Sequence, residues 1–272
     1  MTEIPFRAAA VQLNSTSDED RNWATAQALI REAASRGARF IVTPENTNFL
    51  GPHREKVRRA EPLDGKTCVR FGKLAAECEA FLLLGSFNER SDEPERCYNT
   101  SVLFDPAGRQ IAVYRKIHLF DIDLSEEVSF QESATIKPGE DVVVARTDLG
   151  RLGLSICYDL RFPELYRKLT EDGAELLCVP SAFTRTTGKA HWKLLLCARA
   201  VENQCFVLAA AQCGEHDDQG LRQSWGHSAI IDPWGEVLAM AEEEPGVVIA
   251  ELNLERLSEV RRAMPVAEHR RL

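Results

Sequence analysis

Three residues suited to nucleophilic catalysis each follow a short apolar run of the sequence. Such runs predict buried β-strands. The three are Glu45 after Phe40–Thr43, Lys116 after Ile111–Tyr114, and Cys157 after Leu152–Ile156. A cysteine nucleophile needs a base and a group that stabilises the oxyanion, and a glutamate and a lysine are suited to these roles. Because residues at the ends of neighbouring strands can converge at one edge of a sheet, the pattern indicates a site built around a thiol.

Cys157 stands where a strand ends and a helix is expected to begin. A helical pattern over Pro163–Leu169 follows it after a few polar residues. We expect the thiol to lie at the positive end of this helix, where unpaired backbone N–H groups favour the thiolate. The alternative is a small, inert core residue, since free cysteine is usually buried. Taken alone, Glu45 and Lys116 would both be interpreted as exposed surface charges.

The elements that must position these residues alternate between strands and helices. Predicted strands cover Phe6–Leu13, Phe40–Thr43, Phe81–Gly85, Tyr98–Phe104, Gln110–Tyr114, Val142–Arg146, Leu152–Ile156, Leu176–Pro180, Phe206–Ala211, Ser228–Ile231, Val237–Met240 and Val247–Leu252. Predicted helices cover Asp18–Arg36, Lys66–Glu79, Pro163–Thr170 and Ala190–Asn203, with a short one from Leu254. This order predicts a layered α/β fold with mixed sheets. Since no Gly/Ser/Pro-rich linker divides the chain, residues 1–272 are expected to form one domain.

Two segments show no sustained pattern. Asn46–Gly65 is a polar excursion, and Ile117–Glu140 has no clear period. Long irregular segments in compact chains are usually functional, so we expect Ile117–Glu140 to form a wall of the site, with disorder as the alternative.

Composition excludes several classes of function. The chain has 33 Lys and Arg against 42 Asp and Glu, a net charge of −9, which disfavours nucleic acid as a partner. No apolar stretch approaches the roughly 20 residues of a membrane span, and the first residues lack the features of a signal peptide. We therefore expect a cytoplasmic protein without a membrane partner. No pair of the eight cysteines has C-x-x-C spacing, so most should be reduced core thiols.

The histidines give no metal pattern. His118, His191 and His227 lack i, i+4 spacing with another ligand in a helix. No glycine-rich phosphate or dinucleotide loop is present. The sequence therefore predicts neither a metal nor a cofactor.

Three motifs resemble the signature regions of the nitrilase superfamily of carbon–nitrogen hydrolases. They are VTPEN (Val42–Asn46), YRKIHLF (Tyr114–Phe120) and GLSICYDLRFPE (Gly153–Glu164). The resemblance continues through SAFTRTTGKAHW, RAVENQ and GHSAIIDPWGE, and so covers nearly the whole chain. It implies a four-layer α-β-β-α sandwich that pairs into a homodimer.

The resemblance also implies roles for individual residues. Glu45 is the general base, Lys116 the cationic stabiliser and Cys157 the nucleophile, with the Tyr158 backbone N–H as a further oxyanion donor. Glu45 can serve both as base and as acid if burial moves its pKa toward neutrality against the effect of Lys116. A second glutamate is expected in the loop after the lysine. Glu132 is preferred for it over Glu126 and Glu127.

The substrate expected from the resemblance is a small amide that carries a carboxylate. SAFTRTTGKAHW and LAAAQCG resemble deaminated glutathione amidases, while FQES is similar to omega-amidases. Arg161, Arg185 and Lys189 are candidates to bind the carboxylate, with structural or exposed-charge roles as alternatives. Other possible activities are those of a nitrilase and an N-carbamoyl hydrolase. A non-catalytic dimeric scaffold and a cysteine peptidase represent different classes, although no local pattern supplies the catalytic histidine of a peptidase.

Overall fold

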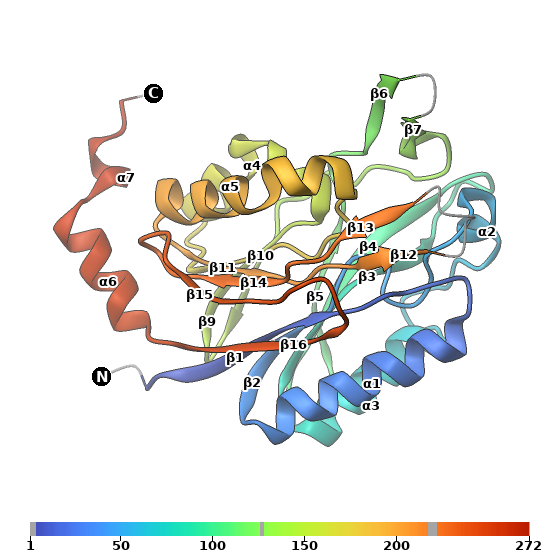
Figure 1. The fold of residues 1–272 in the computed structure, drawn as a ribbon. Helices are drawn as coiled ribbons and strands as arrows, with labels where there is room; N and C mark the ends of the chain where they lie inside the picture. The colour runs from blue at the N-terminus through green and yellow to red at the C-terminus, as the bar shows by residue number, and fades with distance from the viewer. Residues whose placement is uncertain (1–3, 126–127, 217–221, 272) are drawn as a thin grey trace.

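Within the residues that the computed structural model describes, 4–125, 128–216 and 222–271, two six-stranded sheets lie face to face between helices (Figure 1). The first sheet contains β1 (Phe6–Gln12), β2 (Ala38–Val42), β3 (Phe81–Arg90), β4 (Cys97–Phe104), β5 (Gln110–Arg115) and β16 (Gly246–Leu252). The second sheet contains β8 (Val144–Thr147), β9 (Gly150–Leu154), β10 (Leu176–Cys178), β11 (Phe206–Ala209), β14 (Ala229–Ile231) and β15 (Val237–Met240).

Both sheets are mixed, as the alternation of strands and helices predicts. In the first sheet, β1, β2 and β3 are parallel, with β16 antiparallel on one side and the β4–β5 hairpin on the other. In the second sheet, β9, β10 and β11 are parallel, flanked by antiparallel β8 and by the β14–β15 hairpin. Each sheet therefore has a parallel centre, where successive strands end at the same edge.

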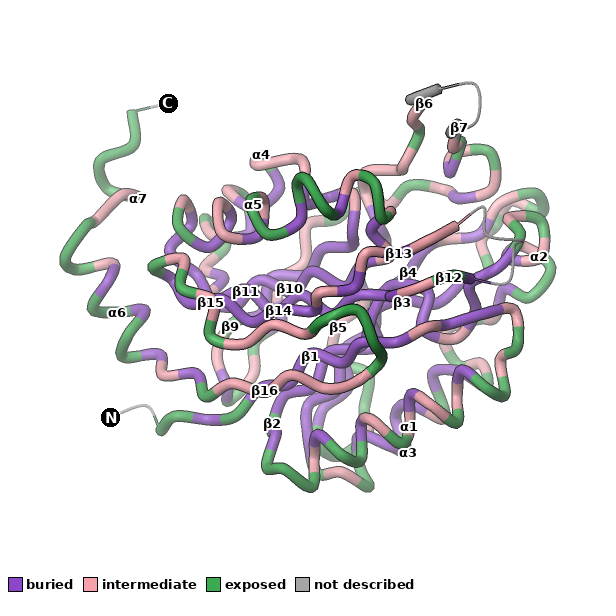
Figure 2. The backbone as a smooth tube through the Cα atoms, viewed as in Figure 1, coloured by how far each residue is buried: buried purple, intermediate pink, exposed green. Residues whose placement is uncertain are grey.

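Alternating side chains join the layers. On β1, Ala8 and Ala10 belong to the core between the sheets, while Ala9 and Val11 pack in the core with α1 (Glu19–Ser35) and α3 (Lys66–Cys78). On the far side, α4 (Pro163–Glu171) and α5 (Arg185–Asn203) cover the second sheet. Burial is concentrated in the central strands and exposure on the outer helix faces (Figure 2). These layers confirm the predicted four-layer α-β-β-α sandwich.

The two segments without a sequence pattern contain short elements. In Asn46–Gly65 lies α2 (His53–Arg58), and in Ile117–Glu140 lie β6 (Asp121–Ser125), β7 (Val128–Gln131) and a 3₁₀ turn over Glu132–Ala134. The strands β6 and β7 pair as an antiparallel hairpin. The sequence shows no period here because runs of four to six residues are too short for a period to stand out.

Other boundaries also differ from the prediction. Helix α5 begins at Arg185 rather than Ala190, and β3 continues to Arg90 rather than ending at Gly85. A further hairpin, β12 (Cys213–Glu215) and β13 (Gln223–Trp225), was not predicted. The chain ends in α6 (Leu254–Ala263) and α7 (Val266–His269) beside the sandwich. Among the described residues, no helix combines the length and the apolar character of a membrane span.

Candidate active site

The three predicted catalytic side chains meet in one cavity of about 500 Å³. Glu45 follows β2, and Lys116 follows β5 at the end of the adjoining hairpin of the same sheet. Cys157 follows β9 of the second sheet. The first sheet thus supplies the carboxylate and the ammonium, while the second supplies the thiol. Glu132 also lines this cavity.

Close backbone packing fixes the turn that carries Glu45. A Cβ atom at Gly85 would collide with the Thr43 carbonyl, so a glycine is required where β3 passes this turn. The next residue, Ser86, donates its N–H to Pro44 O at 3.2 Å. From the far side, the Gln212 amide donates to the Glu45 carbonyl at 2.9 Å. Glu45 is therefore held by contacts from β3 and from the segment that follows β11.

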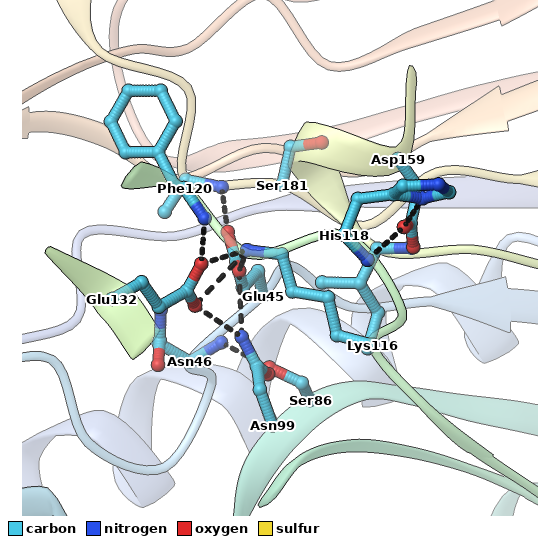
Figure 3. A network of polar contacts seen from close by, with 12 residues as sticks. Glu45, Asn46, Ser86, Asn99, Lys116, His118, Phe120, Glu132, Asp159 and Ser181 are labelled. Carbon is cyan, nitrogen blue, oxygen red and sulfur yellow. Dashed lines mark hydrogen bonds and ion pairs between the residues drawn. The ribbon is translucent and has the colours of Figure 1, made fainter. Parts of the chain in front are cut away.

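Lys116 lies between two buried carboxylates, Glu45 and Glu132, an arrangement that we call the clamp (Figure 3). Its Nζ lies 3.0 Å from Glu45 Oε1, and 3.1 and 2.8 Å from the two oxygens of Glu132. The second Glu45 oxygen accepts the Ala182 N–H at 2.8 Å, and Glu132 accepts the Phe120 N–H at 2.6 Å. Lys116 is only 2% exposed, so these contacts form in a site largely withdrawn from water.

The clamp determines the charge states of Glu45 and Lys116. Burial alone would raise the pKa of Glu45, but the Lys116 charge and hydrogen bonds outweigh it and hold that pKa below its ordinary value. Burial alone would lower the pKa of Lys116, but the charges of Glu132 and Glu45 raise it well above the ordinary value. The pKa of Glu45 is therefore lowered and is not moved toward neutrality, the condition stated above for its use in both steps. The resting carboxylate is ionised, as a general base requires.

Cys157 adopts a backbone conformation that is uncommon for residues with a side chain. Its φ is +49°, and its N–H donates to Pro180 O at 2.9 Å. Cys157 opens a 3₁₀ turn that ends at Arg161, and α4 begins only at Pro163. The thiol is therefore not at the N-terminus of an α-helix, as had been predicted.

The site also does not favour the thiolate form of Cys157. Burial, and next the charge of Glu45, raise the pKa of Cys157 well above its ordinary value, while the charge of Lys116 offsets only part of this rise. The prediction of a thiolate favoured by a helix dipole was wrong. Cys157 rests as a thiol and must lose its proton to a base.

The Tyr158 backbone is suited to the donor role predicted for it. Its N–H follows the nucleophile directly, and among the described residues it has no hydrogen-bond acceptor. Tyr158 lines the cavity, with its ring edge-on to Phe120 at a centroid distance of 5.0 Å. An unused donor beside the thiol is the arrangement that an oxyanion requires.

The three cations predicted to bind a carboxylate lie in different settings. Arg161 is absent from the described cavity lining, and its guanidinium lies over the Tyr158 ring, 5.8 Å from the centroid. Arg185 and Lys189 line the cavity from the first turns of α5 and are exposed. Arg185 already pairs with Glu243 at 3.2 Å. Glu126 and Glu127, the alternatives to Glu132, lie outside the described residues.

The histidines take part in local contacts. His118 contacts a buried carboxylate described below, His191 Nδ1 lies 3.4 Å from Arg161 Nη1, and His227 stacks on Trp225. Within the described ranges, no group of three or more His, Cys, Asp or Glu side chains is arranged to hold a metal ion.

Comparison with known proteins agrees with this geometry. A family model described as carbon-nitrogen hydrolase matches residues 7–262. The deaminated glutathione amidase of Bos taurus is 43% identical over 275 residues, covering 99% of this chain and 83% of that protein. The chain belongs to the carbon–nitrogen hydrolase family. It is therefore a hydrolase that acts on carbon–nitrogen bonds other than peptide bonds.

Two further relatives of this carbon–nitrogen hydrolase extend the comparison. Omega-amidase NIT2 of Homo sapiens is 41% identical over 268 residues, covering 98% of this chain and 95% of that protein. The crystal structure of the C. elegans NitFhit protein matches with a TM-score of 0.93 at 38% identity. That match covers 100% of this chain and 66% of the NitFhit chain.

Sequence reasoning missed Asn99, which lies on β4 beneath the clamp. Its Nδ2 donates to Glu45 Oε1 at 2.8 Å and to Glu132 Oε1 at 3.4 Å, and so bridges the two carboxylates. A signal was present, because the run Asn99–Ser101 puts polar residues inside a strand that otherwise appears buried. Buried polar groups need partners, and the partners of Asn99 are Glu45 and Glu132.

Sequence reasoning also missed Asp159 of the carbon–nitrogen hydrolase. This fully buried carboxylate accepts the Tyr114 hydroxyl at 2.7 Å and the Ile156 N–H at 2.8 Å through Oδ2. Through Oδ1 it accepts the His118 N–H at 3.0 Å and contacts the His118 ring nitrogen at 2.7 Å. Asp159 therefore ties the strand that leads to the lysine to the turn that carries the nucleophile.

We expect Asp159→Asn to damage both stability and turnover. The amide nitrogen would face hydrogen-bond donors, so the free energy of unfolding should fall by about 1–3 kcal/mol. Because the nucleophile turn loses its anchor, kcat per folded molecule should fall by about 10- to 100-fold. Denaturant titration and steady-state kinetics measure the two effects.

Asp232→Asn is the matched control for that variant. Asp232 is also buried and accepts the N–H groups of Trp234 and Glu236 at 2.9 and 2.7 Å, but in a turn between β14 and β15. It should lose stability and keep kcat. Equal kcat in both variants would contradict a positioning role for Asp159.

Proposed function

We propose that this hydrolase cleaves an amide bond of a small carboxylate-bearing substrate through a thioester. The substrates that we propose are the omega-amide of a 2-oxo acid, which would release ammonia, and deaminated glutathione, whose amides are secondary and which would release a dipeptide amine. The observation that carries the proposal is the Lys116 ammonium held between two buried carboxylates in the cavity that contains Cys157. The similarity to a deaminated glutathione amidase and an omega-amidase supports the substrate class.

Acylation begins with a proton transfer. Ionised Glu45 takes the proton of Cys157, and the sulfur attacks the amide carbon. The Tyr158 N–H and the charge of Lys116 stabilise the oxyanion. As the C–N bond breaks, Glu45 returns the proton to the departing nitrogen, which leaves as ammonia from a primary amide or as an amine from a secondary amide, and a thioester remains on Cys157.

Deacylation uses the same carboxylate. Glu45, ionised again, takes a proton from a water molecule that attacks the thioester carbon. The C–S bond breaks, the proton returns to the sulfur, and the carboxylic acid product leaves.

The contacts of Lys116 suggest how it reaches the oxyanion. All three N–H donors of an ammonium are accounted for by one oxygen of Glu45 and both oxygens of Glu132. Because Glu132 binds through both oxygens, Lys116 can turn one donor to the oxyanion and still keep one contact to each carboxylate. In this proposal Glu132 is the second glutamate, and it keeps the ammonium in place during turnover.

Release of ammonia or, from deaminated glutathione, of the dipeptide amine tests the function on a substrate panel. The panel contains deaminated glutathione, omega-amides of 2-oxo acids, amides of dicarboxylic acids, an N-carbamoyl compound and a nitrile, each with wild-type protein and Cys157→Ala. We expect release from a carboxylate-bearing amide, abolished in Cys157→Ala, and the preferred amide distinguishes the two substrates. Release from only the nitrile or the N-carbamoyl compound would contradict the amide assignment. No release from any compound would favour the non-catalytic scaffold.

The expected homodimer, the cytoplasmic location and the single domain stay predictions. Sedimentation velocity on the purified protein would test the dimer directly.

A further inference from the structure

A second buried lysine lies in the active-site cavity. Lys56, on α2, is 4% exposed and lines the cavity that contains Cys157. Its Nζ donates to Asn46 Oδ1 at 3.1 Å. Within the described ranges this is its one hydrogen-bond acceptor, and no carboxylate forms an ion pair with it. The mechanism proposed above gives it no role.

The two buried lysines contrast in their partners. Lys116 has three contacts with carboxylate oxygens. Among the described residues, Lys56 contacts one neutral amide oxygen, which leaves two of its three N–H donors for a ligand. Burying an ammonium without a counter-ion is costly. Accordingly, burial and the charge of Arg222 lower the pKa of Lys56 to about 8, although the charges of Glu132 and Glu45 oppose this. At neutral pH Lys56 is thus a cation that lacks an anionic partner.

The surroundings of Lys56 favour an anion on one side of the cavity. Arg222 also lines the cavity, and its guanidinium donates to Gly51 O at 3.2 Å. Burial, together with the charges of Lys56 and Arg222, lowers the pKa of His53 to about 3, so this neighbour is neutral and adds no charge. Glu45 and Glu132, whose charges also act on Lys56, are already bound to Lys116.

We propose that Lys56 binds the carboxylate of the substrate while the amide end lies against Cys157. The proposal rests on the proposed function and names a group that sequence reasoning missed. It differs from the earlier candidates, Arg185 and Lys189, because both of these are exposed. Exposed charges contribute little to an ion pair, whereas a cation withdrawn from water gains more from its first anion. A short dicarboxylic acid with one end amidated is the substrate class that fits.

Binding without turnover tests the assignment. Cys157→Ala provides a background that cannot form the thioester, and calorimetry measures the Kd of two ligands of equal chain length. These are 4-carbamoylbutanoate, which has an amide and a carboxylate, and pentanamide, which has only the amide. We expect addition of Lys56→Met to weaken 4-carbamoylbutanoate about 10- to 100-fold and to leave pentanamide within about twofold.

Two further variants separate the proposal from a structural role. Lys56→Arg keeps the charge and should retain most of the preference for the carboxylate. Lys189→Met makes the same change at an exposed lysine of the same cavity and tests the earlier candidate. An equal loss of both ligands in Lys56→Met would indicate a role in holding the site together and overturn the proposal. Loss of the preference in Lys189→Met instead, or no preference in the starting protein, would also overturn it.

A pH series gives a second readout. The ammonium form of Lys56 binds the anion, so affinity for 4-carbamoylbutanoate should fall as pH rises above about 8. The groups that face Lys56 and could titrate are His53, Cys97, Glu45 and Glu132, with Arg222 constantly charged. In Lys56→Arg the decline should vanish. A decline that persists there would assign it to another group and count against Lys56.

Ammonia release from the same two ligands separates this proposal from the proposed function. If wild-type protein hydrolyses both equally well, amidase activity stands and the Lys56 assignment fails. If neither ligand is hydrolysed but binding of 4-carbamoylbutanoate depends on Lys56, the assignment of Lys56 as the carboxylate-binding residue stands. The proposed activity on this class of amides then fails.

Discussion

Lys116→Met should cost this hydrolase both its activity and a large part of its stability. The variant leaves Glu45 and Glu132 buried and close together without a counter-charge. Breaking a buried ion pair by removing one partner typically costs about 3–5 kcal/mol of unfolding free energy. Loss of the charge at the oxyanion should lower kcat by about 10²- to 10³-fold, and protonation of the base should lower it further. Denaturant titration and ammonia release measure the two effects.

The pH dependence of stability should reverse in this variant. In wild-type protein the pKa of Glu45 is lowered on folding, so its contribution is present above its unfolded pKa and is lost as pH falls through the folded value. Without Lys116, two adjacent carboxylates force one of them to bind a proton, and its folded pKa rises. That contribution is lost as pH rises. The stability gap between the two proteins should therefore be larger at about pH 8 than at about pH 5.

Lys137→Met provides the matched control. Lys137 pairs with Asp92 and Glu93 at the surface, at 2.7 and 3.1 Å, and lies outside the cavity lining described here. It should keep full activity, with little change in stability. If Lys116→Met kept wild-type kcat, or if its stability gap were the same at both pH values, the clamp described for Lys116 would be contradicted.

Glu45→Gln should lower kcat by about 10²- to 10⁴-fold. The side chain keeps its shape but can no longer take the proton of Cys157, whose raised pKa leaves the thiol protonated at neutral pH. The same loss affects deacylation, since one carboxylate serves both steps. Removal of the negative charge also removes one cause of the raised pKa of Cys157. The residual activity should therefore increase as pH rises through the alkaline range.

Glu89→Gln is the control for Glu45→Gln. Glu89 is buried in the same sheet and pairs with Arg115 at 2.6 Å, but its second partner is the Thr100 hydroxyl, 2.7 Å away. It should lose stability without losing kcat per folded molecule. Alkylation of Cys157 by iodoacetamide, located by mass spectrometry, would show that the cavity of Glu45→Gln is intact. Unchanged kcat in Glu45→Gln would rule out Glu45 as the base.

The sequence pattern was sufficient to predict a layered α/β fold with mixed sheets and the convergence of three strand ends. Apolar runs such as Phe40–Thr43 and Leu152–Ile156 are buried on both faces, so they stand out even without alternation. The pairing of two sheets came from the resemblance, since no local pattern states which sheet a strand joins. Short elements such as α2 and the β6–β7 hairpin escaped notice because they contain too few residues for a period.

The errors at the site have an electrostatic origin. The raised pKa of Cys157 depends on burial and on Glu45, which lies over a hundred positions away in the chain. The lowered pKa of Glu45 depends on the opposed effects of burial and Lys116. Lys56 was missed for a related reason, since a lysine in a polar segment is ordinarily exposed. Such quantities arise only after distant segments pack together.

The division of the catalytic groups between two sheets has a consequence during folding. The nucleophile belongs to one half of the sandwich, while the base and the cation belong to the other. A chain with only one half assembled therefore has either Cys157 without the carboxylate that accepts its proton, or Glu45 without the thiol that it deprotonates. Amide cleavage should appear in a single step with the docking of the halves.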